Sequence, residues 1–178
     1  MRSPLLLTPL LLLLPTFLFA QQDGKNVTIL DGKIELTVPD RLQPMSDELW
    51  HLKYPGKPRA LLALKDADNT CYFIVILSEI PMQESEVAAY AWSQYKQMQK
   101  DSAEFRFPEK PHGTIMVNGK KLGYTKFIYL PTRNGKFGCY YFAAVDGRLV
   151  GLFFDIDQTK KALWEPVVNE IIQSLKIK

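Results

Sequence analysis

Short apolar stretches separated by turn-forming residues dominate the chain from residue 27 onward, and they predict a β-rich protein. The predicted strands span residues 27–30, 33–38, 60–64, 71–77, 114–117, 122–130, 137–145 and 149–156. Asp31-Gly32, Asn118-Gly119 and Asp146-Gly147 separate successive strands, and such pairs favour tight hairpin turns because they tolerate positive φ. Strands joined this closely pair antiparallel, so the second half of the chain is expected to form a meander.

Two longer segments have the apolar period of 3.6 residues that is typical of an amphipathic helix. On residues 84–100 the apolar stripe consists of Val87, Tyr90, Ala91, Tyr95 and Met98. On residues 159–175 it consists of Leu163, Val167, Val168, Ile171, Ile172 and Leu175. A shorter helix is expected after Ser46, a suitable N-cap followed by two acidic residues. Because strands and helices are segregated along the chain, the predicted fold class is α+β.

One strand indicates how the layers are arranged. Residues 71–77 are Cys-Tyr-Phe-Ile-Val-Ile-Leu, so the strand is apolar on both faces. Strands of this kind are covered on both sides. We therefore expect an antiparallel sheet sandwiched by helices, with Val75 and Ile76 both in the interior, on opposite sides of the sheet.

The first twenty residues have the layout of a cleaved secretory signal peptide. Arg2 supplies the positive charge, residues 5–19 are almost entirely apolar, and Ala20 ends the segment before two glutamines. A retained membrane anchor is the alternative, but the run is shorter than the roughly 20 residues of a membrane span and is interrupted by prolines. We expect residues 1–20 to be removed, which leaves residues 21–178 as a single α+β domain with no further membrane span.

Composition and charge are those of a globular protein. Of the 178 residues, 47% are hydrophobic and 23% are charged, which excludes a disordered or a collagen-like chain. The formal net charge of +3 is too small to indicate a nucleic-acid partner. Cys71 and Cys139 form an even pair, so in an oxidising compartment a disulfide is one interpretation. Each also lies within an apolar strand, where buried free thiols are common, and this alternative stays open.

No motif typical of a catalytic, phosphate-binding or metal centre is found in the sequence. Gly-x-Ser-x-Gly and the Gly-rich phosphate loop are absent, and the two histidines, His51 and His112, lie in unrelated segments. Asp155 and Asp157 are alternate residues at the end of a predicted strand. They are candidates for a cation site, or Asp157 caps the helix that follows. The expectation is a non-catalytic protein without a cofactor.

Two short sequences and the order of the elements resemble a known family. The sequences are Met45-Ser46-Asp47-Glu48 with Lys53-Tyr54-Pro55, and Ile171-Ile172-Gln173-Ser174-Leu175 near the end of the chain. Together with the order of hairpins, meander and helices, they resemble the PsbP-like superfamily of α/β/α sandwiches, including bacterial DcrB-like exported proteins. The resemblance covers residues 26–178. It implies a binding or assembly role and brings no catalytic residue to this chain.

Binding surfaces are the remaining candidates for function. Cations gather in the segments predicted to join the strands: Lys57, Arg59, Lys120, Lys121, Arg133 and Lys136. Where such loops lie at one end of a sheet, they form a basic patch for an acidic protein partner. The alternative is that they are charges on exposed turns that keep the protein soluble. Aromatic residues of the meander are expected mainly in the core, and an exposed patch of them would mark a partner site.

These observations lead to one hypothesis and two alternatives. The hypothesis is a periplasmic or secreted, non-catalytic module that binds another protein, such as an assembly factor, an inhibitor or an immunity protein. The first alternative is a carrier of a small apolar ligand in a cavity between sheet and helix. The second is a hydrolase or metal enzyme whose site the sequence does not reveal.

Overall fold

The computed structural model describes residues 24–101, 103–131 and 135–178, and these residues form an α+β fold, as predicted. The predicted signal peptide, residues 1–20, and Arg133 lie outside the described residues. The helices are α1 (Asp47–Lys53), α2 (Val87–Lys100) and α3 (Lys161–Ser174), with 3-10 turns at Glu84–Glu86 and Gln158–Lys160. In the described part of the chain, none of the helices has the length and apolar character needed to cross a membrane.

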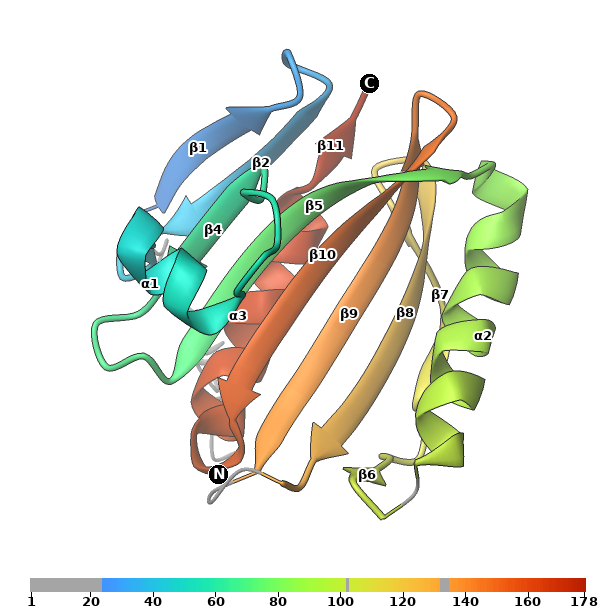
Figure 1. Ribbon diagram of the computed structural model, residues 1–178. Helices are drawn as coiled ribbons and strands as arrows, with labels where there is room; N and C mark the ends of the chain where they lie inside the picture. The colour runs from blue at the N-terminus through green and yellow to red at the C-terminus, as the bar shows by residue number, and fades with distance from the viewer. Residues whose placement is uncertain (1–23, 102, 132–134) are drawn as a thin grey trace, which may run out of the picture.

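The strands form two antiparallel sheets within the described residues (Figure 1). They are β1 (Gly24–Ile29), β2 (Ile34–Pro39), β3 (Gln43–Pro44), β4 (Leu62–Lys65), β5 (Cys71–Pro81), β6 (Phe105–Arg106), β7 (His112–Val117), β8 (Lys120–Tyr129), β9 (Lys136–Val145), β10 (Arg148–Asp157) and β11 (Lys176–Ile177). The large sheet has the order β3-β4-β5-β10-β9-β8-β6, and β7 pairs with β8 on the same side as β6. A small sheet has the order β1-β2-β11.

Local turn and cap chemistry form these elements as the sequence predicts. Asp31 and Gly32 both have positive φ, 52° and 84°, which suits the tight turn of the β1–β2 hairpin. Asn118 and Asp146 also have positive φ in the turns before β8 and β10. Ser46 caps α1, and its side-chain oxygen accepts a hydrogen bond from the Leu49 backbone N–H at 3.2 Å. Short-range backbone preferences therefore determine where these strands and this helix begin.

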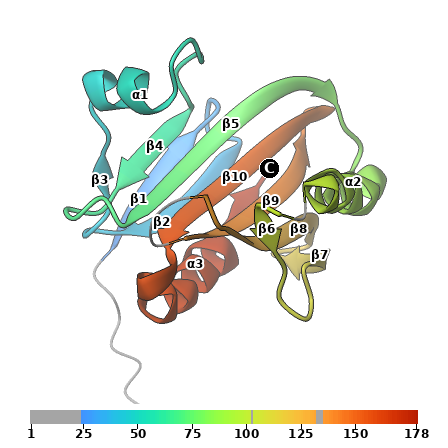
Figure 2. The same ribbon diagram turned by 60° about the horizontal axis from the view of Figure 1, so that its bottom comes forward.

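One face of the large sheet is covered by α3 and by strand β2 of the small sheet (Figure 2). The main hydrophobic core fills this layer. Phe73 of β5 and Phe154 of β10 stack at its centre, with ring centroids 4.3 Å apart. Trp164 of α3 is buried in this core with 2% of its surface exposed, whereas Leu163, which the periodicity places on the apolar stripe, is 55% exposed. The other predicted stripe residues are buried as expected: Val167, Val168, Ile171, Ile172 and Leu175. The prediction is therefore wrong only in the first turn, where Trp164 and not Leu163 enters the core.

The opposite face is covered by α1 and α2, which stand apart over different strands (Figure 1). Trp50 of α1 packs in a cluster with Ile74 of β5, and Val87 of α2 packs in a cluster with Phe142 of β9. The strip of β5 and β10 between the two helices is only partly covered. Val75 is fully buried, but Ile76 on the other face is 36% exposed. The prediction that both residues lie in the interior is wrong for Ile76, because neither helix reaches over it.

Close packing of α2 on the sheet depends on a glycine. A Cβ atom added to Gly123 of β8 would lie 2.2 Å from the Val87 carbonyl oxygen and 3.0 Å from the Ala91 Cβ. Beside this contact, the Thr125 hydroxyl donates a hydrogen bond to the Ala91 carbonyl oxygen at 2.9 Å. Gly123 thus allows the helix backbone to approach the strand, as glycine often does within a strand. The contact holds α2 at the β8 side of the sheet, away from α1.

Candidate functional site

A groove, which we call the central groove, runs across the partly covered strip between α1 and α2. It has two lobes that share Tyr140 and Asp155. The α1 lobe has a volume of about 430 Å³ and is lined by Trp50, Tyr54, Lys57, Pro58, Ile74, Ile76, Leu77, Ser78 and Phe153 together with the shared pair. The α2 lobe has a volume of about 360 Å³ and is lined by Lys53, Met98, Phe105, Phe127, Tyr129 and Lys136 together with the same pair. Most of this lining is apolar or aromatic.

Strand register sets the floor of the central groove. Ile74 of β5 pairs with Phe153 of β10, and Phe153 pairs with Tyr140 of β9, so these three side chains form one row across the sheet. Paired residues of adjacent strands point to the same face. The neighbouring row contains Asp155 in β10 and its partner Gly138 in β9. The apolar row and the carboxylate are therefore placed side by side by backbone pairing.

Two glycines make room for aromatic rings on this floor. A Cβ atom on Gly138 would lie 2.2 Å from the Phe127 ring, and one on Gly151 would lie 2.4 Å from the Phe153 ring. The Phe127 and Phe153 rings therefore occupy the space that a side chain at Gly138 or Gly151 would fill. Tyr140 makes edge-to-face contacts with both rings, with centroid distances of 4.8 Å to Phe127 and 4.7 Å to Phe153. Such contacts favour a rigid, preformed floor.

The α1 side of the groove is built by aromatic and basic residues. The rings of Trp50 and Tyr54 lie 4.6 Å apart, and the Trp50 indole N–H donates to the Lys57 carbonyl oxygen at 3.4 Å. Arg59 donates a hydrogen bond to the Met45 carbonyl oxygen at 2.6 Å, which fixes the segment after α1. These contacts hold the α1 wall in place over β4 and β5.

The polar centre of the groove is Asp155. Its Oδ1 accepts a hydrogen bond from the Tyr140 hydroxyl at 3.0 Å. Burial raises the pKa of the Asp155 carboxyl, while the Tyr140 hydrogen bond and the positive charges of Lys53 and Lys136 act in the opposite direction. Burial is also the main cause of the lowered pKa of Lys53, whose Nζ lies 3.6 Å from the centre of the Tyr72 ring. A carboxylate and an ammonium group thus share a poorly hydrated site.

One hydroxyl in this centre lacks a partner. The Tyr54 hydroxyl oxygen is buried and makes no hydrogen bond to any of the described residues. Burial, and next the Asp155 charge, raise the pKa of Tyr54, so the hydroxyl stays protonated and can donate a hydrogen bond. Buried polar groups are nearly always hydrogen-bonded, so the Tyr54 hydroxyl is available to a water molecule or to a ligand group that enters the groove.

Asp157 lies beside Lys136 of the groove lining, and its side chain does not cap the helix that follows. It occupies the position before the 3-10 turn Gln158–Lys160, but its side chain makes no capping hydrogen bond. Instead its carboxylate forms an ion pair with Lys136 Nζ. In the residues that the structure describes, no group of three or more His, Cys, Asp or Glu side chains is placed to hold a metal ion. The sequence offered a helix cap and a cation ligand as alternatives for Asp157. In the structure its carboxylate instead forms an ion pair with Lys136.

The predicted basic residues fall into separate places. Lys57 and Lys136 line the two lobes of the central groove, and Arg59 is engaged by Met45 and by Asp47, whose carboxylate lies 3.4 Å away. Lys120 and Lys121 begin β8 at the opposite end of the meander from Lys136. Arg133 lies outside the described residues. The described cations therefore do not gather into one patch.

Cys71 and Cys139 are both buried free thiols. Strand β10 lies between their strands, because Cys71 pairs with Ile156 and Cys139 pairs with Phe154. Two strand spacings separate their backbones by roughly 10 Å, whereas a disulfide requires Cα atoms within about 7 Å. Of the two sequence interpretations, the fold therefore contains the free thiols and not the disulfide.

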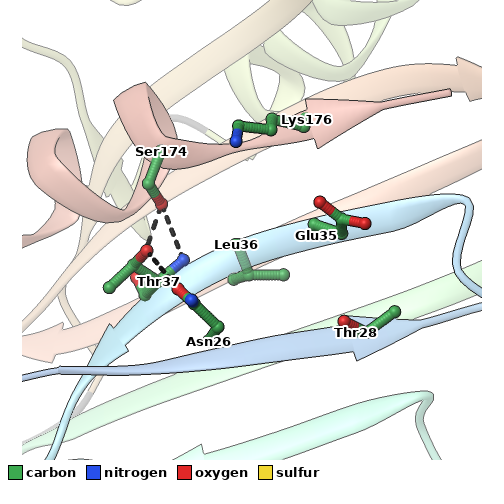
Figure 3. Close-up of a pocket in the computed structure, with 7 residues that line it drawn as sticks. All are labelled: Asn26, Thr28, Glu35, Leu36, Thr37, Ser174 and Lys176. Carbon is green, nitrogen blue, oxygen red and sulfur yellow. Dashed lines mark hydrogen bonds between the residues drawn. The ribbon is translucent and has the colours of Figure 1, made fainter.

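A second hollow, of about 290 Å³, lies where the end of α3 meets the small sheet, and its polar groups hydrogen-bond to one another (Figure 3). The Thr37 backbone N–H donates to the Ser174 hydroxyl oxygen at 2.8 Å, and the Thr37 hydroxyl donates to Asn26 Oδ1 at 3.0 Å. These groups satisfy one another and join α3 to β2. The central groove, with its apolar floor and unpaired hydroxyl, is the better candidate for a binding site.

Comparisons with known proteins support the fold. No protein-family model matches the chain, and no curated protein matches it significantly. Among solved structures, a cyanobacterial PsbP from Synechocystis sp. PCC 6803 is similar, with a TM-score of 0.63 and 11% identity over 88% of this chain and 94% of that one. LpqN of Mycobacterium tuberculosis has a TM-score of 0.60 and 15% identity over 88% and 91% of the two chains.

A Bacteroides thetaiotaomicron protein is also similar, with a TM-score of 0.56 and 10% identity over 87% of this chain and 48% of that one. The chain therefore has a PsbP-like fold, which confirms the resemblance drawn from its sequence. At these identities the likeness concerns the fold alone.

Proposed function

We propose that this protein is an exported, non-catalytic module that binds an apolar segment of another protein in the central groove. The fold supports a role outside the cytoplasm, since it is shared with LpqN, a protein described as involved in cell envelope biogenesis. The signal-like layout of residues 1–20 supports the same compartment. The similarity to PsbP adds a second relative of this architecture.

Chemical groups of the described residues support a non-catalytic role. Asp155 is held by Tyr140, and Asp157 is paired with Lys136. Burial raises the pKa of the Cys139 thiol to about 11 and raises that of Cys71 as well, so neither is a ready nucleophile. Both thiols also lie on the face covered by α3, away from the groove.

The exposure of Ile76 is the observation that carries the proposal. An apolar β-branched side chain at the middle of a sheet is normally covered, yet Ile76 is 36% exposed beside an apolar groove. Concave apolar surfaces with a few polar groups are typical of binding sites. The groove is open rather than enclosed, since it extends from α1 to α2 through two lobes, and an open groove suits a segment of a larger molecule.

The test uses Ile76→Glu and the matched control Leu163→Glu. Both change an exposed apolar residue to a carboxylate, but Leu163 lies on α3 behind the sheet. Binding of the neutral apolar dye Nile red is measured first, and the wild type is then used to capture proteins from the exported fraction of the native host. We expect Ile76→Glu to abolish dye binding. We also expect the wild type and Leu163→Glu to capture one protein in stoichiometric amount, and Ile76→Glu not to capture it. Equal behaviour of the two variants would overturn the proposal.

A carrier of a small apolar ligand is the second candidate. The α1 lobe, at about 430 Å³, lies within the usual range for small-molecule sites and has a mainly apolar lining. Native mass spectrometry of protein purified from the host distinguishes the candidates. A bound molecule of lipid mass that Ile76→Glu lacks would favour the carrier, and a captured protein without such a molecule would favour the protein-binding module.

A further inference from the structure

We infer that the central groove selects an uncharged apolar peptide segment and binds one backbone amide of that segment between Asp155 and Tyr54. This inference rests on the proposed function and adds the chemistry by which the partner is recognised. Three features of the groove support it: the order of apolar and polar parts, the balance of charge, and the unused hydrogen-bonding groups.

The polar centre lies between two apolar lobes. Asp155 and Tyr140 line both lobes, with Ile76 and Phe153 on one side and Phe105 and Phe127 on the other. A complementary ligand is therefore apolar at both ends and polar in the middle. A fatty acid or a similar single-chain lipid has its polar group at one end, so it leaves one lobe empty or places methylene groups against the carboxylate. A peptide with apolar side chains has polar amides between them.

Charges at the polar centre of the groove balance. The positive charges of Lys53 and Lys136 act on the Asp155 carboxyl, and Lys136 also forms an ion pair with Asp157. Two carboxylates therefore accompany two ammonium groups. Lys57 adds an exposed cation at the rim of the α1 lobe, where water screens it. A charged ligand group of either sign would meet a like charge at the centre and would also lose its hydration there. An uncharged polar group meets no like charge, and its smaller desolvation cost is offset when it forms hydrogen bonds in the groove.

An amide uses the free hydrogen-bonding groups. A carboxylate accepts about four hydrogen bonds, and the described residues supply Asp155 with one, from Tyr140. The buried Tyr54 hydroxyl has no partner among them. The N–H of a backbone amide can donate a hydrogen bond to Asp155, and its carbonyl oxygen can accept one from the Tyr54 hydroxyl. One amide therefore pairs with both side chains. Esters and ethers lack the N–H, and amines lack the acceptor.

The experiment changes the ligand and the protein separately. The probe is a capped, uncharged peptide of Leu and Ala with about six residues, the usual length of a strand. Its ester analogues each replace one backbone amide N–H by oxygen. Affinities are measured by displacement of Nile red, and sodium decanoate serves as the lipid probe. Because an N–H bonded to a carboxylate contributes strongly, we expect one ester position to weaken binding about tenfold.

Tyr54→Phe tests the other half of the site. We expect it to weaken binding of the amide peptide about three- to tenfold while leaving protein stability unchanged or higher. A peptide with Lys or Glu at its centre is expected to bind more weakly than the uncharged peptide. Equal affinity for every ester analogue, or tighter binding of decanoate than of peptide, would overturn the inference.

The two proposals fail in different ways. When Ile76→Glu leaves peptide and dye binding intact, the groove is not the binding site and the proposed function is wrong. Ile76→Glu could instead abolish binding while the ester analogues and Tyr54→Phe leave the peptide affinity unchanged. The groove would then bind apolar molecules without recognising a backbone amide. Only the inference about the amide is then wrong.

Discussion

The hydroxyl of Tyr140 lies 3.0 Å from Oδ1 of Asp155 on the partly covered face of the sheet. The two side chains come from adjacent strands, and the residue directly opposite Asp155 is Gly138, over which the Phe127 ring lies. This hydrogen bond favours the ionised form of Asp155, but burial has the larger effect and raises the pKa of the carboxyl. We therefore expect Asp155 to make the stability of the folded protein depend on pH.

Asp155→Asn is expected to gain stability relative to the wild type as the pH rises above about 4. Burial holds the folded-state pKa of Asp155 above its ordinary value of 3.8, so the folded protein binds this proton more tightly than the unfolded chain does. The stability that the proton supplies is present at low pH and is lost as the pH rises through the folded-state pKa. Urea unfolding of both proteins between about pH 3 and pH 7 measures the difference, and a constant difference would contradict the raised pKa.

Tyr54→Phe and Tyr140→Phe are expected to differ in their effect on the free energy of unfolding. Tyr54 has a buried hydroxyl without a partner among the described residues, so its removal is expected to be neutral or to stabilise by up to about 1 kcal/mol. Tyr140→Phe removes the hydrogen bond to Asp155 and is expected to cost about 1–3 kcal/mol. Chemical denaturation of the two variants provides the comparison, and equal losses would show that Tyr54 has a partner in solution.

Gly123→Ala is expected to displace α2 and to cost about 3 kcal/mol or more, because the new Cβ would lie 2.2 Å from a backbone oxygen that cannot move alone. Gly113→Ala is the control. Its Cβ would meet the end of the flexible Tyr124 side chain at 2.9 Å, so we expect a cost below about 1 kcal/mol. Thermal unfolding checks both values, and a small loss for Gly123→Ala would mean that α2 does not pack as closely as described.

Both cysteines are expected to resist an aromatic disulfide reagent in the folded protein and to react fully after unfolding. Each thiol is buried, and burial raises the pKa of Cys139 to about 11, so the reactive thiolate is scarce at neutral pH. Counting the labelled thiols by mass spectrometry, with and without urea, measures this. Detection of a Cys71–Cys139 disulfide in protein from the native host would contradict the strand order.

The functional centre was only partly visible in the sequence. Asp155 and Asp157 drew attention as paired acidic residues, but their roles, one held by Tyr140 and one paired with Lys136, depend on the neighbouring strand. Tyr54 looked like part of a structural motif. Glycines inside apolar strands, Gly138 and Gly151, were the available signal for a special surface, since glycine in a strand often marks close approach of another group. The sequence did not show that aromatic rings lie over them.

By itself, the sequence determined the turns, the helix at Ser46 and the antiparallel meander. These depend on the φ preferences of residues such as Asp31 and Gly32 and on capping within a few positions, so neighbouring residues contain all the information. Only the tertiary structure decided that Ile76 stays partly exposed while Val75 is buried. Both are apolar residues of one strand, so the local sequence does not predict their different exposure. The difference arises because close packing at Gly123 places α2 over β8, and Ile76 lies in the gap between α2 and α1.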